Sequence, residues 1–339
     1  MTFCAAPFVH MVQNPDGQFR TCCMYEKPLT GNYANIKEAF DSEENKIIRE
    51  RMLSGEKLDE CIKCDIDEMH EGKLRLSYRD EFNSLYKKYI DNPSFRTLEI
   101  SVSNKCNFKC VDCGPRFSNQ FGPTITNNLP DASNYKDLDF LKILGGEPFL
   151  DNKNVELIKQ VPRHNIKLML VTNNSIFPNA SILELLSEFK HLNINISIDG
   201  IGEVAEYVRP GTKWTRFERN WSKWMKWKNE RRGQCFVNPH FVFHNFNSIF
   251  FDETLEWSDI SLHNWSWDFL MMPEHLNMSY LPNRVKEFIL QKNKNFKKPL
   301  EKFLGSNCYN KTFFKLFLSK IKTVPKKMEE FVDLCFREI

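Results

Sequence analysis

The chain has 339 residues, enough for two or three domains with a substantial core. Hydrophobic residues make up 41% of the sequence and charged residues 27%, a composition that is ordinary for a globular protein and excludes a disordered one. No apolar stretch approaches the roughly 18 residues of a membrane span, and the first residues lack the features of a secretory signal, so we expect a cytoplasmic protein without a membrane partner.

Residues 1–72 contain a predicted hairpin followed by a helical pattern. A turn at 14–17 would join two short strands, at 10–13 and 18–22, through Gly17. Apolar residues then recur every three to five positions over 35–53, which predicts a helix.

These elements would gather four cysteines. The hairpin can bring Cys4 to Cys22, and the following helix can return Cys61 and Cys64 to the same point. Four soft ligands suit Zn²⁺ or a fully ligated [4Fe–4S] cluster equally well, so the chemistry alone leaves both open. Cys23 could replace its neighbour Cys22 as the ligand.

A connecting helix is expected over 73–94, and strands and helices alternate over 95–285. Six strands are predicted, at 97–103, 140–144, 167–172, 193–198, 239–244 and 266–271. Helical patterns lie between them, around 153–161, 180–189, 214–229 and 252–259. This order indicates right-handed crossovers and a parallel sheet curved into a partial (β/α)6 barrel of the α/β class, whose chemistry gathers at the carboxyl ends of its strands.

Residues 286–339 are expected to form two or three helices. The net charge of the chain is +3, but residues 284–327 carry 13 Lys and Arg against two acids. A basic segment can attract nucleic acid or an acidic peptide, although interleaved Phe and Leu residues favour an ordinary solvated helical surface.

A C-x3-C-x2-C loop follows the first strand of the predicted barrel, at Cys106, Cys110 and Cys113. Three thiolates on one tight loop suit three irons of a [4Fe–4S] cluster and leave the fourth iron open to a ligand. Spacing alone also allows zinc or unbound thiols. Cysteines crowded into the first 113 residues of a cytoplasmic chain favour metal ligation over disulfides.

A second motif, Gly145-Gly146-Glu147-Pro148, follows the second strand of the predicted barrel. Two glycines let the backbone approach a ligand closely, and proline stiffens the exit from the strand. Alone, this motif could be an ordinary turn.

Together, the cysteine loop and the Gly-Gly-Glu-Pro motif resemble those of the radical S-adenosylmethionine (radical SAM) superfamily, over about residues 95–285. The resemblance implies that the open iron of a [4Fe–4S] cluster chelates S-adenosylmethionine. An electron from a reductant such as flavodoxin or ferredoxin then yields a 5′-deoxyadenosyl radical, which abstracts hydrogen from a substrate. Cys106, Cys110 and Cys113 would be catalytic, and residues 145–148 would contact the cofactor.

The same resemblance suggests further cofactor contacts at strand ends: Asn173, Asn174, Ser197, Asp199 and Arg209. Arg209 would pair with the methionine carboxylate, for which a guanidinium fork is suited. Each could instead be structural, the asparagines and Asp199 as turn residues and Arg209 as a surface cation.

One position departs from the superfamily pattern. The residue before the third cysteine is usually apolar and packs near adenine, whereas here it is Asp112. Phe108 or Val111 would then take the packing role.

Residues 3–68 resemble the SPASM/Twitch auxiliary-cluster module, with its hairpin, helix and C-x2-C pair. This implies a second, auxiliary [4Fe–4S] cluster on Cys4, Cys22, Cys61 and Cys64, with Cys22 favoured over Cys23. The module follows the barrel in well-known members and precedes it here.

The sequence does not identify the substrate. A peptide is the first expectation, and dehydrogenation of a small sugar-like or amino alcohol is the second. RNA modification is a third, suggested only by the basic segment. The alternative from another class is a zinc-binding interaction protein.

Overall fold

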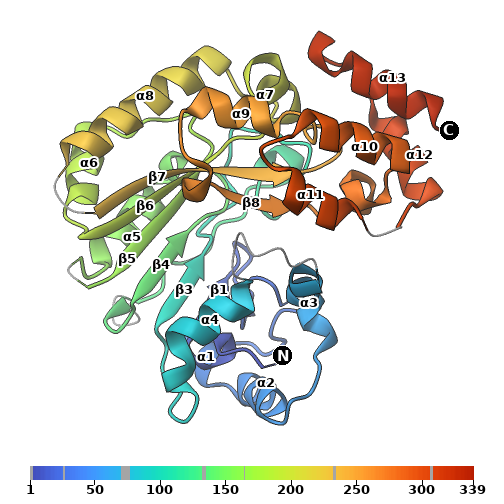
Figure 1. The fold of residues 1–339 in the computed structure, drawn as a ribbon. Coiled ribbons are helices and arrows are strands. Elements are labelled where there is room, and N and C mark those ends of the chain that lie inside the picture. Colours follow the sequence, from blue (N-terminus) through green and yellow to red (C-terminus); the bar gives the residue numbers. More distant parts are fainter. Residues whose placement is uncertain are drawn as a thin grey trace.

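The computed structural model describes residues 3–25, 27–69, 77–131, 135–163, 165–231, 234–305 and 308–339. One eight-stranded sheet forms the centre of the molecule, with the strand order β2-β1-β3-β4-β5-β6-β7-β8 (Figure 1). The sheet is curved and does not close into a barrel, so the predicted partial barrel is confirmed.

Six parallel strands form the predicted part of this sheet. They are β3 (Thr97–Ile100), β4 (Phe140–Ile143), β5 (Lys167–Thr172), β6 (His191–Ser197), β7 (Gln234–Phe243) and β8 (Ser266–Phe269). Only β7 differs strongly from its predicted bounds, because it begins five residues before Pro239. Proline is tolerated there because β8 pairs with β7 only from His240 onward, so the proline nitrogen borders no partner on that side.

The N-terminal hairpin belongs to the same sheet. Strand β1 (His10–Gln13) pairs antiparallel with β2 (Phe19–Arg20), and its other edge pairs in parallel with β3. His10 lies opposite Thr97 in that register. The hairpin was predicted, but its union with the barrel sheet was not.

Four helices accompany the hairpin: α1 (Ile36–Asp41), α2 (Glu43–Leu53), α3 (Ile62–Met69) and α4 (Tyr78–Tyr86). The single helix predicted over 35–53 is divided at Ser42, whose hydroxyl accepts a hydrogen bond from the Asn45 amide and caps α2. Helix α4 is the described part of the predicted connecting helix. Residues 73–76 of that prediction lie outside the described residues.

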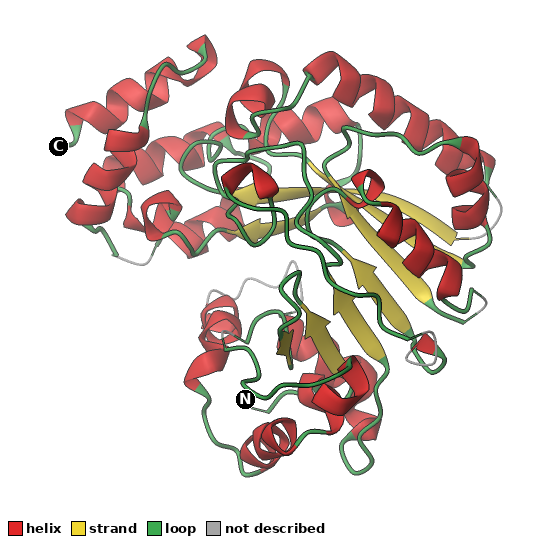
Figure 2. Cartoon of the chain, turned by 180° about the vertical axis from the view of Figure 1, so that it is seen from behind, coloured by secondary structure: helices red, strands yellow, loops and turns green. Residues whose placement is uncertain are grey.

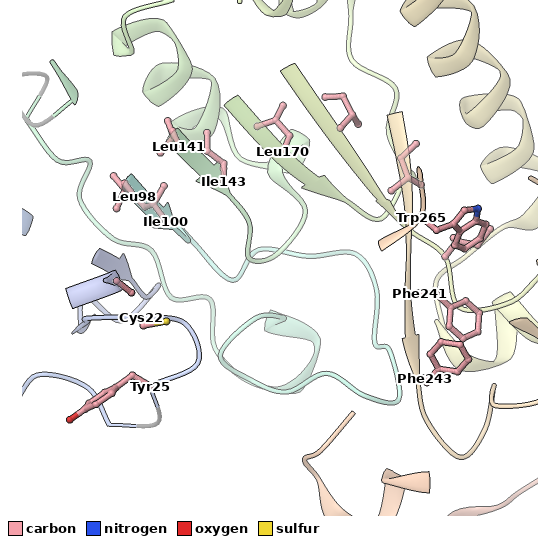
Figure 3. Packing of buried hydrophobic residues seen from close by; sticks show 14 of the residues in the cluster. Cys22, Tyr25, Leu98, Ile100, Leu141, Ile143, Leu170, Phe241, Phe243 and Trp265 are labelled. Carbon is pink, nitrogen blue, oxygen red and sulfur yellow. The ribbon is translucent and has the colours of Figure 1, made fainter. Parts of the chain in front are cut away.

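Five helices connect the strands of the barrel and lie along the outer side of the curved sheet (Figures 1 and 2). They are α5 (Asn152–Gln160), α6 (Ala180–Ser187), α7 (Gly202–Val208), α8 (Trp214–Glu230) and α9 (Phe251–Ser258). Side chains alternate between the two faces of a strand. The outer face therefore carries the apolar core, including Leu98, Ile100, Leu141, Ile143 and Leu170 (Figure 3).

The C-terminal region has four helices rather than the predicted two or three: α10 (Asn283–Lys292), α11 (Lys297–Leu304), α12 (Lys311–Lys320) and α13 (Glu329–Arg337). Helix α11 lies beside β8 (Figure 1). Stacked aromatic rings hold it there, since Phe303 stacks on Phe269 at 4.1 Å and Phe296, at its N-cap, stacks on Phe243 at 5.1 Å. None of the helices in the described ranges is long and apolar enough to cross a membrane.

Candidate functional site

The cysteine loop lies at the carboxyl ends of the parallel strands and is fastened to the segment that follows α7. The Lys109 amide donates to the Pro210 carbonyl at 2.8 Å, and the Val111 amide donates to the Val208 carbonyl at 3.0 Å. The loop therefore resembles a short added strand whose position depends on a segment nearly 100 residues away in sequence. Its thiols are held on a fixed backbone.

A cavity of about 170 Å³ opens beside this loop. Its walls come from the loop, from the ends of β4, β5 and β6, and from the segment after α7. They comprise Cys106, Phe108, Cys110, Cys113, Phe117, Leu144, Gly145, Gly146, Val171, Thr172, Asn173, Ser197 and Arg209. We call this space the barrel cavity. All three loop cysteines and six other residues predicted to bind the cofactor line it.

The two glycines of the Gly-Gly-Glu-Pro motif are required by the neighbouring backbone. Gly145 has a φ of +85° and Gly146 a φ of +58°, conformations that side chains disfavour. A Cβ at Gly146 would lie 2.2 Å from the Lys105 carbonyl oxygen, and one at Gly145 would lie 2.6 Å from the Ser101 side chain. The glycines thus let β4 end directly against the cysteine loop, which is a packing reason that the sequence did not reveal.

Glu147 lies behind the cavity wall, and Pro148 lies with it, since neither is among the lining residues. The Glu147 carboxylate accepts hydrogen bonds from the Thr172 hydroxyl at 2.8 Å and the Asn173 amide at 2.7 Å. Burial raises the pKa of this carboxyl to about 7 despite these bonds. Through these hydrogen bonds, Glu147 joins the end of β4 to the end of β5.

The two asparagines after β5 occupy different places. The Asn173 side-chain amide donates to the Asn107 side chain at 3.0 Å, next to the Cys106 sulfur, and Asn173 lines the barrel cavity. Asn174 has a φ of +62° and donates to the Phe217 carbonyl, so its side chain holds α8. Asn174 instead lines a smaller neighbouring pocket.

Arg209 and Asp199 form a buried pair at the cavity wall. The Arg209 guanidinium donates to one Asp199 carboxylate oxygen at 2.5 Å, while the other oxygen accepts from the Val242 amide at 2.9 Å. Asp199 is fully buried and does not line the cavity, whereas Arg209 and Ser197 do. Asp199 therefore orients the guanidinium toward the cavity.

Asp112 is half-buried and lies in the same group of charges. Burial raises the pKa of its carboxyl, and neighbouring Asp199 raises it further, while His244 and Arg209 oppose the shift. Phe108 lines the cavity, as predicted for the packing role, and Val111 does not. His244, at the end of β7, is fully buried and was missed by the sequence analysis because an isolated histidine carries no pattern.

The N-terminal cysteines surround a second, much smaller cavity between the β2 loop, α2, α3 and α4. Cys4, Cys22, Cys61 and Cys64 all line it, and Cys23 does not. We call this space the N-terminal cavity. Within the described ranges, no three His, Cys, Asp or Glu side chains are arranged to hold a single metal ion.

Burial raises the pKa of two or more thiols at each cavity. The values reach about 12 for Cys4 and Cys110 and about 11 for Cys61 and Cys113. Thiolates at such positions need strong positive charge nearby, which metal cations supply. The donor sets therefore suit metal centres, with three thiols at the barrel cavity and four at the N-terminal cavity.

Sequence reasoning also missed two charged residues inside the barrel strands, Glu99 on β3 and Lys142 on β4. They form an ion pair of 3.0 Å. A signal was present, since each charge interrupts an otherwise apolar strand that was predicted to be buried.

No protein-family model matches the chain. Among curated proteins, it is 30% identical over 129 residues to a probable GTP 3′,8-cyclase of Methanocaldococcus jannaschii, covering 37% of this chain and 42% of that protein. It is 25% identical over 104 residues to an S-adenosylmethionine-dependent nucleotide dehydratase of Selenomonas ruminantium, covering 29% and 38% respectively. The chain therefore spans less than half the length of either relative.

Two solved structures give weaker similarities. Native anSMEcpe with bound AdoMet matches with a TM-score of 0.45 and 19% identity, over 66% of each chain. SuiB of Streptococcus suis bound to its precursor peptide SuiA matches with a TM-score of 0.40 and 15% identity, over 79% of this chain and 60% of that one. TM-scores below 0.5 establish neither the fold nor the substrate of this chain.

The three-cysteine loop and the Gly-Gly-Glu-Pro motif end adjacent parallel strands and meet at one cavity. The curated relatives include a protein that is S-adenosylmethionine-dependent by name. In these motifs and in this part of its sequence, the chain resembles the radical S-adenosylmethionine superfamily.

Proposed function

We propose that the chain reductively cleaves S-adenosylmethionine at a [4Fe–4S] cluster bound by Cys106, Cys110 and Cys113. The observation that supports this most is the barrel cavity, where three thiols face a wall of glycine backbone and polar side chains. When bound, the cluster and S-adenosylmethionine together supply a 5′-deoxyadenosyl radical that abstracts hydrogen from a substrate. A flavodoxin or ferredoxin would provide the electron.

Residues around the cavity would position the cofactor. The Arg209 guanidinium, held by Asp199, would pair with the methionine carboxylate. Asn173 would present its amide next to Cys106, and Glu147 would fix Asn173 through the backbone amide. Phe108 would pack against the adenosine part, while Ser197 offers a hydroxyl on the β6 side.

We further propose an auxiliary [4Fe–4S] cluster in the N-terminal cavity on Cys4, Cys22, Cys61 and Cys64. Four lining thiols support it, and the place of Cys23 outside that lining supports Cys22 as the ligand. With every iron ligated by protein, this cluster would transfer electrons rather than bind the cofactor.

Anaerobic reconstitution tests both clusters. We expect about eight irons per chain, from two four-iron clusters, and formation of 5′-deoxyadenosine after addition of dithionite and S-adenosylmethionine. Protein with its iron intact that forms no 5′-deoxyadenosine would refute the proposed activity. About four irons with one zinc would remove only the auxiliary cluster.

For the substrate, we propose a peptide, as the basic C-terminal segment suggests. The names of the two curated relatives support a nucleotide as a second candidate. Incubation of the active protein with acidic peptides or with GTP separates the two. A modified peptide is identified by its mass, and a nucleotide product, whose mass a cyclisation leaves unchanged, by its chromatographic retention. Loss of two mass units on a peptide would support a dehydrogenation or a crosslink.

A further inference from the structure

A buried ion pair lies on the inner face of the sheet, opposite the apolar core. Glu99 on β3 and Lys142 on β4 occupy directly paired positions, with 3.0 Å between the Lys142 Nζ and the Glu99 carboxylate. Their side chains are only 8% and 17% exposed. Because apolar residues usually stabilise such positions at least as well, the fold alone gives no reason to keep two charges there.

Helix α4 places a tyrosine against this pair. Tyr78 and Phe82 are four residues apart and so share one face of the helix. Phe82 packs on His10 of β1 with ring centroids 5.0 Å apart, and the Lys142 ammonium donates to the Tyr78 hydroxyl at 3.5 Å. Helix α4 therefore covers the inner face of the sheet at β1 and β3, with Tyr78 directed at Lys142.

The set lies between the two cavities. Leu144, which lines the barrel cavity, is on the same face of β4 as Lys142 and about 7 Å further along the strand. On the other side, Arg79 follows Tyr78 on α4 and lines the N-terminal cavity. A group bound at Lys142 would thus lie close to both the barrel cavity and the N-terminal cavity.

The hydrogen-bond donors of this set favour an anion. Burial opposes the charged form of Lys142, but the Glu99 carboxylate holds the lysine pKa well above its usual value. Arg20 adds a second cation near Glu99, whereas burial lowers the pKa of His10 to about 4 and keeps it neutral. In the described part of the chain, Lys142 donates to Glu99 and Tyr78, which leaves its third N–H and the tyrosine O–H for another acceptor.

The opposite wall carries the acidic Asp268 on β8, whose carboxylate lies 3.5 Å from the His240 ring. Its negative charge also acts on Tyr78, so an anion bound there depends on its hydrogen bonds to Lys142 and Tyr78.

We propose that Lys142 and Tyr78 bind an oxyanion of the substrate, a carboxylate or a phosphate, on the inner face of the sheet, and that Glu99 positions Lys142. The inference rests on the proposed function, because it names the group by which that reaction's substrate is held.

The test is isothermal titration of the iron-loaded, oxidised full chain under anaerobic conditions. Saturating S-adenosylmethionine is present so that Arg209 is occupied. Succinate is the carboxylate probe and inorganic pyrophosphate the phosphate probe. We expect one probe to bind. Its affinity should fall at least tenfold in Lys142→Met and about threefold in Tyr78→Phe, as expected for a charged and a neutral hydrogen bond.

Matched controls are the exposed Lys159→Met on α5 and Tyr280→Phe, a tyrosine remote from the site, and both should bind like the wild type. Lys142→Met leaves Glu99 unpaired and can fail to fold. The double variant Lys142→Met with Glu99→Gln removes both charges and should show the same weakening.

The inference is overturned if neither probe binds the wild type, or if Tyr78→Phe and the double variant bind as tightly as the wild type. Cleavage of S-adenosylmethionine by the same wild-type sample is assayed in parallel. Cleavage without probe binding refutes this inference alone. Probe binding that depends on Lys142, without cleavage, refutes the proposed function alone.

Discussion

The two cysteine cavities differ in the number of their thiols and in the residues that face them. At the barrel cavity, three cysteines on one loop face Arg209, Asn173 and the Gly145-Gly146 backbone. At the N-terminal cavity, four cysteines from three separate segments face apolar residues and Arg79, which is neutralised by Asp65 and Glu68.

Under the proposed function, this difference corresponds to two roles within one sheet. A wall of unhindered backbone and a directed guanidinium leaves room for a small zwitterionic ligand. A fourth thiol and an internally neutralised arginine leave no such place. The number of thiols and the polarity of the facing wall together separate a site that binds a ligand from one that is closed by protein.

The largest expected effect comes from removing thiols at each cavity separately. Cys113→Ala and the double variant Cys61→Ala/Cys64→Ala should each reduce iron from about eight to about four per chain. Only Cys113→Ala should abolish 5′-deoxyadenosine formation, which chromatography measures. Cys308→Ala, at an exposed thiol, should change neither quantity. Loss of S-adenosylmethionine cleavage in both cysteine variants would contradict separate roles for the two cavities.

The glycine wall is tested by Gly146→Ala. Strain at a positive φ, together with a Cβ 2.2 Å from the Lys105 carbonyl oxygen, should cost about 4 kcal/mol in the free energy of unfolding. Urea unfolding measures it. The control is Gly122→Ala, where the new Cβ would lie 3.7 Å from the Pro115 Cβ and stability should hardly change. Equal stability of the two variants would contradict a packing role for Gly146.

Strand β1 joins the N-terminal cysteine region to the barrel sheet, and the burial of His10 on this strand is tested by the pH dependence of stability. Burial lowers the pKa of His10 from 6.5 to about 4, so the unfolded chain takes up this proton first as pH falls. The wild type should therefore lose about 2 kcal/mol of stability through His10 between pH 6.5 and pH 5. His10→Gln should lack this component, and exposed His263→Gln should retain it. Parallel pH profiles of the wild type and His10→Gln would mean that His10 is accessible to protons.

The smallest effect is expected from Arg209→Lys, which keeps the charge beside Asp199 and loses the planar fork. Affinity for S-adenosylmethionine should fall about tenfold, or about 1.4 kcal/mol. Equilibrium titration of the iron-loaded protein measures it. The exposed Arg219→Lys on α8 is the control. An unchanged affinity in Arg209→Lys would mean that another residue binds the methionine carboxylate of S-adenosylmethionine.

Much of the barrel could be predicted because its signals are local. The apolar strands beginning at 97, 140 and 167 and the crossover helices between them follow from short-range patterns, and their order implies parallel pairing. The cysteine loop and the glycine motif sit at strand ends by the same reasoning.

What could not be predicted depends on long-range contacts. Parallel pairing of β1 with β3 joins segments almost 90 residues apart and leaves no periodic trace in either. The need for glycine at 146 comes from the Lys105 carbonyl, and the position of Glu147 behind the wall comes from Thr172 and Asn173. Residues 73–76, part of the predicted connecting helix, lie outside the described residues.

The pairing of β1 with β3 also affects how the protein can be divided. A truncation that starts after the N-terminal cysteines would strip β3 of its hydrogen-bonded neighbour and expose a bare strand edge, which favours aggregation. It would also uncover the apolar side chains of Val9 and Met11, both fully buried in the intact chain. The N-terminal cysteine region is thus not a detachable appendage, and its removal would compromise the solubility of the barrel itself.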